Sequence, residues 1–149
     1  MASRDIIVFD FETGSRNPHK TQPTQIAAMA LDGRSLRPKG TFNSEIRPIL
    51  DDEKAIAAGL DPIEDEALKI TGKNREALAK APQLKTVWKK FIGFVDKYNW
   101  KSTQWFAPIP AGWNIIGFDM VIINRLCKEY GPFNKDRGQQ KLFHAIFKI

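Results

Sequence analysis

The sequence predicts a single α/β domain with a mixed β-sheet. Three short segments rich in β-branched or aromatic residues come first, and helical segments with one further extended segment follow. This order is typical of a sheet flanked by helices, and it differs from the order in a helical bundle or a β-sandwich. The 149 residues, 42% of them hydrophobic, suit one domain with one core, which we expect to cover residues 1–149.

Three strands are expected over residues 5–12, 24–31 and 40–47, because each segment is rich in strand-forming residues and ends at a turn signal or a proline. The second and third are predicted to pair as an antiparallel meander. A fourth segment, residues 105–111, is apolar and extended. Its two prolines favour an edge or irregular strand over a central one.

Helices are expected over residues 61–71, 83–98, 119–130 and 139–147, and Asn74 is expected to cap a brief turn that reaches residue 79. The segment 83–98 is the clearest helix, because apolar residues recur at helical spacing and lysines occupy the other face. Gly72 and Gly131 follow two of these segments, at the position where helices commonly end.

The composition limits the partners and the compartment. The 23 Lys and Arg residues outnumber the 17 acids, which favours contact with polyanions, although the basic residues are scattered and a solvated surface accounts for most of them. No apolar run is long enough to span a bilayer and no cleavable signal precedes the first strand, so we expect a cytoplasmic protein without membrane contact. The single cysteine, Cys127, excludes an internal disulfide and a multi-thiolate zinc site.

Two acids stand close together on the first predicted strand. Asp10 and Glu12 are two residues apart, so the strand period of two places both carboxylates on one face. Two acids in an apolar strand cost several kcal/mol of desolvation unless a cation or another partner offsets it. The pair alone is also explained by acids at the solvated end of an edge strand.

A second polar segment leads from the fourth extended segment into the helix over residues 119–130. It reads Asn114-Ile-Ile-Gly-Phe-Asp119. Asp119 could be a helix cap, a metal ligand or both, since a carboxylate at a helix start can accept hydrogen bonds from free backbone amides. Capping explains Asp119 but leaves Asn114 and the turn before it without a reason.

These two segments resemble motifs of the DEDD superfamily of 3′–5′ exonucleases. Phe9-Asp-Phe-Glu-Thr-Gly14 is similar to the first motif, and the step of five residues from Asn114 to Asp119 is similar to the second motif of family B polymerase proofreading domains and exonuclease-I-like enzymes. Further similar segments lie between the two motifs. The resemblance implies a ribonuclease-H-like three-layer α/β fold, with a central mixed β-sheet flanked by helices and its C-terminal part missing.

The resemblance also implies a chemistry. Asp10, Glu12 and Asp119 would be the catalytic residues and would hold two Mg²⁺ or Mn²⁺ ions, which prefer such oxygen ligands and can promote phosphodiester hydrolysis. Thr13, Gly14 and Asn114 would contact the substrate. The expected partner is nucleic acid with a single-stranded or frayed 3′ end, DNA before RNA, in replication, repair or a viral genome.

The chain also departs from the family pattern. Trp113 stands where many relatives carry His or Tyr, and Trp100, Trp105 and Phe106 are expected in the core rather than at the substrate. The third motif, which supplies a general base and a fourth carboxylate, is expected to lie beyond residue 149. His19 and His144 are both expected to serve surface or packing roles instead.

The missing motif has consequences for activity and association. We therefore expect impaired activity and an open C-terminal side, covered by a partner or a second copy of the chain. The alternative function is a catalytically silent nucleic-acid-binding or scaffolding module that keeps the exonuclease fold.

Overall fold

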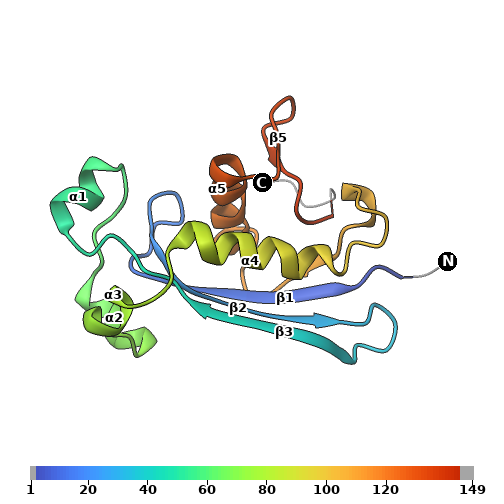
Figure 1. The fold of residues 1–149 in the computed structure, drawn as a ribbon, viewed down its shortest axis with the longest axis horizontal. Helices are drawn as coiled ribbons and strands as arrows, with labels where there is room; N and C mark the ends of the chain where they lie inside the picture. The colour runs from blue at the N-terminus through green and yellow to red at the C-terminus, as the bar shows by residue number, and fades with distance from the viewer. Residues whose placement is uncertain (1–2, 145–149) are drawn as a thin grey trace.

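The computed structural model describes residues 3–144, and its centre is a four-stranded mixed sheet in the order β3-β2-β1-β4 (Figure 1). The first three strands form an antiparallel meander, and β4 pairs with β1 in parallel. This arrangement confirms the predicted α/β class and meander. The strands are β1 (Ile6–Thr13), β2 (Pro23–Leu31), β3 (Pro38–Glu45) and β4 (Ile109–Ala111).

Two helices cover one face of the sheet. They are α4 (Leu84–Asp96) and α5 (Asp119–Tyr130), close to the predicted ranges. Ile7, Phe9 and Phe11 of β1 belong to the same buried cluster as residues of both helices, as the alternation of a strand requires. Burial of this apolar surface is the main force that holds the helices against the sheet.

Three short helices lie beyond the end of the sheet where β1 terminates (Figure 1). Gly72 ends α2 in the left-handed conformation at φ 70°, and the Asn74 side chain caps α3 by accepting from the Ala77 amide at 2.8 Å. Both caps confirm the sequence prediction. The helix α1, which starts after Asp51 as its cap, was not predicted. The bounds are α1 (Asp52–Ala57), α2 (Asp65–Thr71) and α3 (Arg75–Ala79).

Two predicted elements were wrong in part. Residues 105–111 do not form one strand: a 3₁₀ turn, η1 (Gln104–Phe106), precedes the three-residue β4, as the prolines of this segment allow. The helix expected over residues 139–147 is absent from its described part, where β6 (Gln139–Gln140) pairs with β5 (Phe133–Asn134). Residues 145–147 of that prediction lie outside the described residues.

The Gln140 side chain explains this second correction. It is buried, accepts from the Phe143 amide at 2.8 Å and donates to the Phe143 carbonyl at 3.3 Å, so it fixes a local turn in place of a helix. The turn places Leu142 and Phe143 in the core, and the Phe143 ring stacks on Phe9 with 5.2 Å between ring centroids.

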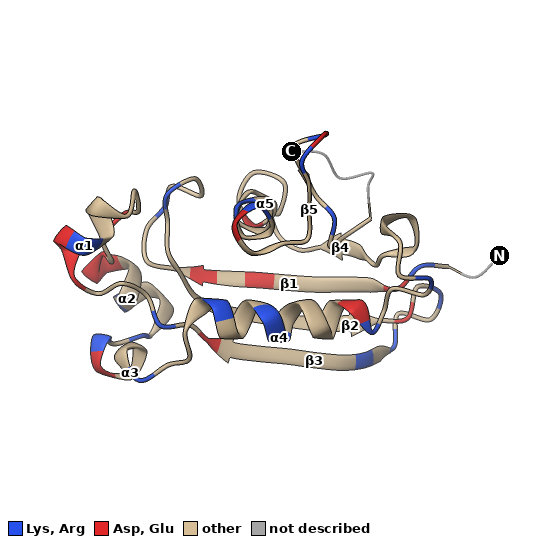
Figure 2. Cartoon of the chain, turned by 45° about the horizontal axis from the view of Figure 1, so that its top comes forward, with Lys and Arg blue, Asp and Glu red and all other residues tan. Residues whose placement is uncertain are grey.

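The basic residues are scattered over the fold (Figure 2), as they are along the sequence, and the single cysteine is buried. Lys and Arg residues are spread over α4, β3 and several loops (Figure 2). Cys127 is buried in the core, and burial raises the pKa of its thiol to about 12. Within residues 3–144, no helix is both long and apolar enough to cross a membrane.

Candidate active site

The two acids of β1 lie on the face of the sheet that α4 and α5 leave open. Their neighbours Phe9 and Phe11 are buried in the core, whereas Asp10 is exposed and Glu12 is partly buried. Burial, followed by the charge of Asp10 and a side-chain hydrogen bond with it, raises the pKa of Glu12 above its usual value. The two carboxylates are therefore close enough to oppose each other's ionisation.

Asp119 reaches the same strand from the start of α5. Its side chain is 3% exposed, and its Oδ2 accepts a hydrogen bond from the Phe11 amide at 2.9 Å. This bond forms because β4 pairs with β1 only as far as Val8, which leaves the rest of that strand edge unpaired. The residue before the helix, Phe118, provides no side-chain cap, and the Asp119 carboxylate bonds the backbone of β1 as well as its own amide.

Asp119 interacts electrostatically with both Asp10 and Glu12. Burial is the main cause that raises the pKa of Asp119 to about 6; the charges of Asp10 and Glu12 contribute to this rise, and the hydrogen bond from Phe11 opposes it. A buried acid whose pKa is raised by two other acids is a common feature of functional sites. The structure thus brings together the three carboxylates that the two sequence motifs separate by more than 100 positions.

The carboxylate oxygens of Asp10, Glu12 and Asp119 are donors that suit a hard cation, but the described residues do not form a complete metal site. Oxygen donors of this kind match Mg²⁺ or Mn²⁺. In the described part of the chain, however, no three His, Cys, Asp or Glu side chains are grouped so that they could hold one ion. The carboxylates are neighbours: Asp119 accepts from the Phe11 amide, and Glu12 interacts with Asp10.

The backbone conformation of the turn between β4 and α5 accounts for the residue types at Gly112 and Asn114. A side chain at Gly112 would lie 2.7 Å from the Phe9 carbonyl, so only glycine fits there. Asn114 has φ 50°, in the left-handed region that asparagine tolerates better than most residues. Asn114 is exposed, so its side chain is also accessible to a substrate.

Asn114 offers a test that separates these two roles. We expect Asn114→Gly to keep the free energy of unfolding within about 0.5 kcal/mol, because glycine accepts the same φ, while lowering the rate of nucleic-acid cleavage. Asn114→Ala should destabilise the fold by about 1 kcal/mol through strain at this φ. Urea unfolding and cleavage rates check both. Full activity in the glycine variant would limit Asn114 to the turn.

Thr13 and Gly14 differ in what they can offer a substrate. Thr13 lines a small cavity of about 150 Å³ together with Arg16, Glu64 and Thr71. The Gly14 amide donates to the Gln22 carbonyl at 3.0 Å, and its carbonyl accepts from the Glu64 amide at 2.9 Å. A side chain at Gly14 would lie 2.2 Å from the end of the Ile63 side chain, so a larger residue there would require Ile63 to move.

Lys73 was not singled out from the sequence. Its side chain is 12% exposed, forms an ion pair with Glu45 at 3.2 Å and donates to the side chain of Gln25. Glu12, Gln25 and Glu45 stand opposite one another on β1, β2 and β3, and the charge of Lys73 partly offsets the rise in the pKa of Glu12. No local pattern marks Lys73, because its partners come from strands far away in sequence.

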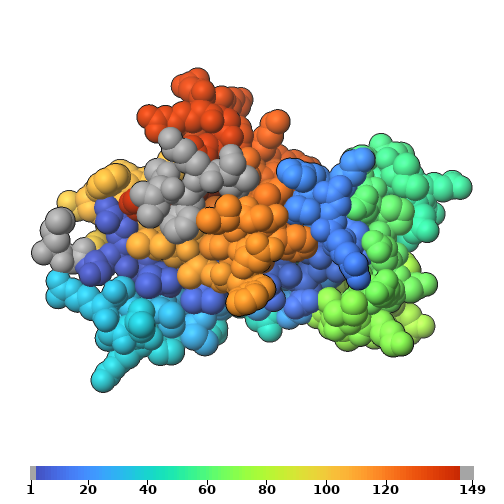
Figure 3. Space-filling view, turned by 180° about the vertical axis from the view of Figure 1, so that it is seen from behind, coloured from blue at the N-terminus to red at the C-terminus, as the bar shows by residue number. Residues whose placement is uncertain are grey.

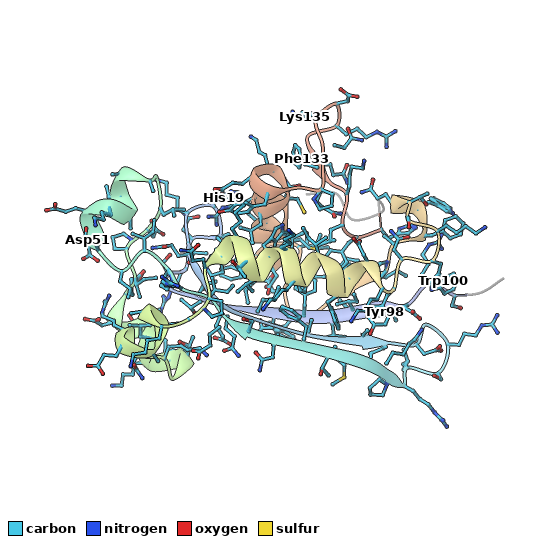
Figure 4. All side chains as sticks on the ribbon, viewed as in Figure 1. His19, Asp51, Tyr98, Trp100, Phe133 and Lys135 are labelled. Atoms are coloured by element: carbon cyan, nitrogen blue, oxygen red, sulfur yellow. The ribbon has the colours of Figure 1, made fainter. Side chains whose placement is uncertain are left out.

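Both histidines lie away from the three carboxylates or on the surface, and two tryptophans are more exposed than expected. His144 is buried, and its amide donates to the Pro108 carbonyl just before β4, at the end of β1 away from Asp10. His19 is exposed in the loop after β1 (Figure 4). The expected burial of Trp100 and Trp105 was wrong, since they are 40% and 60% exposed.

Fold and site together define a nuclease-like domain of the ribonuclease-H-like class, and the comparisons with known proteins agree. The model of the family described as Exonuclease (RNase T) matches residues 7–103. The chain therefore belongs to the RNase T exonuclease family. The match includes Asp10 and Glu12 and ends before Asn114 and Asp119.

Solved structures of exonuclease I share the fold. The enzyme from Methylocaldum szegediense is 20% identical with a TM-score of 0.61, over 85% of this chain and 24% of that one. E. coli exonuclease I in complex with a dT13 oligonucleotide is 16% identical with a TM-score of 0.65, over 85% and 24%. The chain thus spans about a quarter of their length. No curated protein sequence matches the chain.

Proposed function

We propose that this domain is a metal-dependent 3′–5′ exonuclease that hydrolyses phosphodiester bonds at the 3′ ends of DNA. The observation that carries the proposal is that Asp119 is hydrogen-bonded to the strand that holds Asp10 and Glu12, so that the charges of these two acids reach it. Membership of an exonuclease family supports this reaction class.

Each carboxylate has a distinct task in this proposal. Asp119 is held in place by the Phe11 amide, so its orientation is set before any substrate arrives. Asp10 is exposed and is the acid that a phosphodiester meets first, while the partly buried Glu12 stands next to Thr13 and its cavity. Two Mg²⁺ or Mn²⁺ ions, when bound, would help neutralise the charge that develops on the transferred phosphoryl group.

The substrate preference follows from charge and shape. A net charge of +6 favours a polyanion. The cavity beside Thr13 offers polar contacts for a terminal nucleoside, with Thr71 and Arg16 on its walls. The exonuclease I structure with a bound dT13 oligonucleotide is a structural neighbour, which supports DNA as the first substrate to test.

Cleavage of labelled oligonucleotides tests the proposal. We expect a single-stranded DNA oligonucleotide with a 5′ label to be shortened stepwise from its 3′ end when Mn²⁺ or Mg²⁺ is present, and to stay intact with a chelator. A 3′-phosphorothioate end should slow the reaction. Products that shorten from the 5′ end, or internal cuts, would contradict the proposed polarity.

A catalytically silent nucleic-acid-binding module is the second candidate. It is favoured by the finding that, within the described residues, no three acidic, His or Cys side chains are grouped to hold an ion. A thermal-unfolding titration with Mn²⁺ separates the two functions. Oligonucleotide binding without a metal-induced rise in Tm and without cleavage would establish the binding module.

A further inference from the structure

The four tryptophans of the chain differ greatly in exposure. Trp88 is buried at 2% exposure, and its Nε1 donates to the Gly131 carbonyl at 2.9 Å. Trp113, in contrast, is 94% exposed in the turn between β4 and α5. Ile116 in the same turn is 58% exposed. An indole side chain usually contributes by burial, so a tryptophan almost wholly in water points to a role in binding.

Trp113 is held in position by its neighbours in the turn. Gly112 lies against the Phe9 carbonyl, one residue before Asp10, and Ile115 is buried with its carbonyl bonded to the Met120 amide at 2.6 Å. The 112–118 segment, orange in Figure 3, stands on the surface beside the dark blue β1. Trp113 therefore lies between two fixed neighbours, Gly112 beside β1 and the buried Ile115, in the turn that leads to Asp119.

Trp105, unlike Trp113, makes ring contacts within the protein. The Arg4 guanidinium lies 4.8 Å from the centre of the Trp105 ring, and the His144 ring lies 5.3 Å from it. Trp105 is thus engaged within the protein although it is partly exposed. Among the residues that the structure describes, Trp113 has no such ring or cation contact, so its faces are available to a ligand.

We propose that Trp113 is the stacking platform for an unpaired base of the strand whose 3′ end lies at Asp10, Glu12 and Asp119, an inference that rests on the proposed function. Every nucleobase has a flat aromatic face, and stacking on an aromatic side chain strengthens binding by roughly 5- to 150-fold per base. In a duplex both faces of an internal base are covered by its neighbours. Trp113 therefore favours single-stranded or frayed ends over paired ends.

The test compares Trp113→Ala and Trp113→Phe with Trp100→Ala. Trp100 is also exposed, but it lies at the opposite end of the sheet, near Tyr98 (Figure 4). Binding of a fluorescein-labelled single-stranded DNA oligonucleotide is measured by anisotropy with a chelator present, and KM and kcat are measured with Mn²⁺. We expect Trp113→Ala to raise Kd and KM about 5- to 150-fold with little change in kcat. Phe should recover part of the loss, and Trp100→Ala should stay within about twofold of the wild type.

Oligonucleotides with one abasic nucleotide at each position near the 3′ end provide the second arm. One abasic position should weaken binding to the wild type as much as Trp113→Ala does and should cost the variant nothing more. Binding of a blunt duplex in a chelator should be nearly unaffected by Trp113→Ala, so the preference for binding single strands should fall.

The possible results distinguish a failure of the stacking role of Trp113 from a failure of the proposed exonuclease function. If the wild type binds and cleaves the oligonucleotide and Trp113→Ala does so equally well, the stacking role is wrong while the proposed function stands. Equal losses in Trp113→Ala and Trp100→Ala would also overturn it, because the effect would then belong to exposed aromatics in general. If the wild type neither binds nor cleaves, both proposals fail.

Discussion

Asp10→Ala should abolish metal-dependent cleavage while the fold stays intact. Asp10 is exposed, so its removal leaves no cavity in the core. It also removes a charge that raises the pKa values of Glu12 and Asp119, so the free energy of unfolding should be unchanged or slightly higher. We expect the cleavage rate to fall by on the order of 10²- to 10⁴-fold, as for the loss of a positioned catalytic group.

Asp136→Ala is the matched control for this variant, because Asp136 is an exposed acid in the turn between β5 and β6, outside the carboxylate site. Cleavage rates at saturating Mn²⁺ and thermal unfolding in a chelator give the two readouts. An Asp10→Ala protein that cleaves at the wild-type rate would remove Asp10 from the site.

Asp119→Asn should stabilise the metal-free protein at neutral pH and inactivate it. The pKa of Asp119 rises from 3.8 to about 6 on folding, so the folded state holds the proton more tightly. The contribution of this group to stability is then fully present below pH 4 and is lost between about pH 4 and pH 6, by about 2 to 3 kcal/mol in total. Asparagine carries no charge and still presents an oxygen to the Phe11 amide, so its advantage should develop from about pH 4 and be nearly complete above pH 6.

Urea unfolding of both proteins at pH 4 and pH 8, in a chelator, measures this difference. The Asp119→Ala variant is the control: it also removes the charge but leaves the buried Phe11 amide without its acceptor, which costs about 1 to 3 kcal/mol. A stability difference between wild type and Asp119→Asn that is the same at both pH values would contradict the raised pKa.

Local patterns predicted those parts of the site that depend on local geometry. The strand period placed Asp10 and Glu12 on one face, and helix caps at Gly72 and Asn74 followed from their residue types. The contact of Asp119 with β1 is a property of the folded chain, because it depends on β4 ending early. Only the resemblance to known motifs grouped Asp119 with the other two acids in advance.

The elements that the sequence analysis missed depend on distant or polar contacts. The position of Lys73 is set by contacts with Gln25 and Glu45 on two strands. Nothing in the sequence around Lys73 therefore distinguishes it from the other lysines. The helix predicted near the end of the chain failed because Gln140 bonds the backbone of Phe143. The six-residue α1 buries only Ala55, too little for an apolar pattern to indicate it.

The early end of β4 also fixes the length of the segment that joins the two motifs. The strand is held to β1 by three residue pairs that end at Val8 and Ala111, and Asp119 must then reach Phe11 on the same edge. A one-residue deletion between residues 112 and 118 would either break the carboxylate's bond to Phe11 or shift β4 by one position, about 3.3 Å, and so exchange its inward and outward residues. Surface loops usually tolerate insertions and deletions, but this one acts as a spacer of set length between the halves of the site.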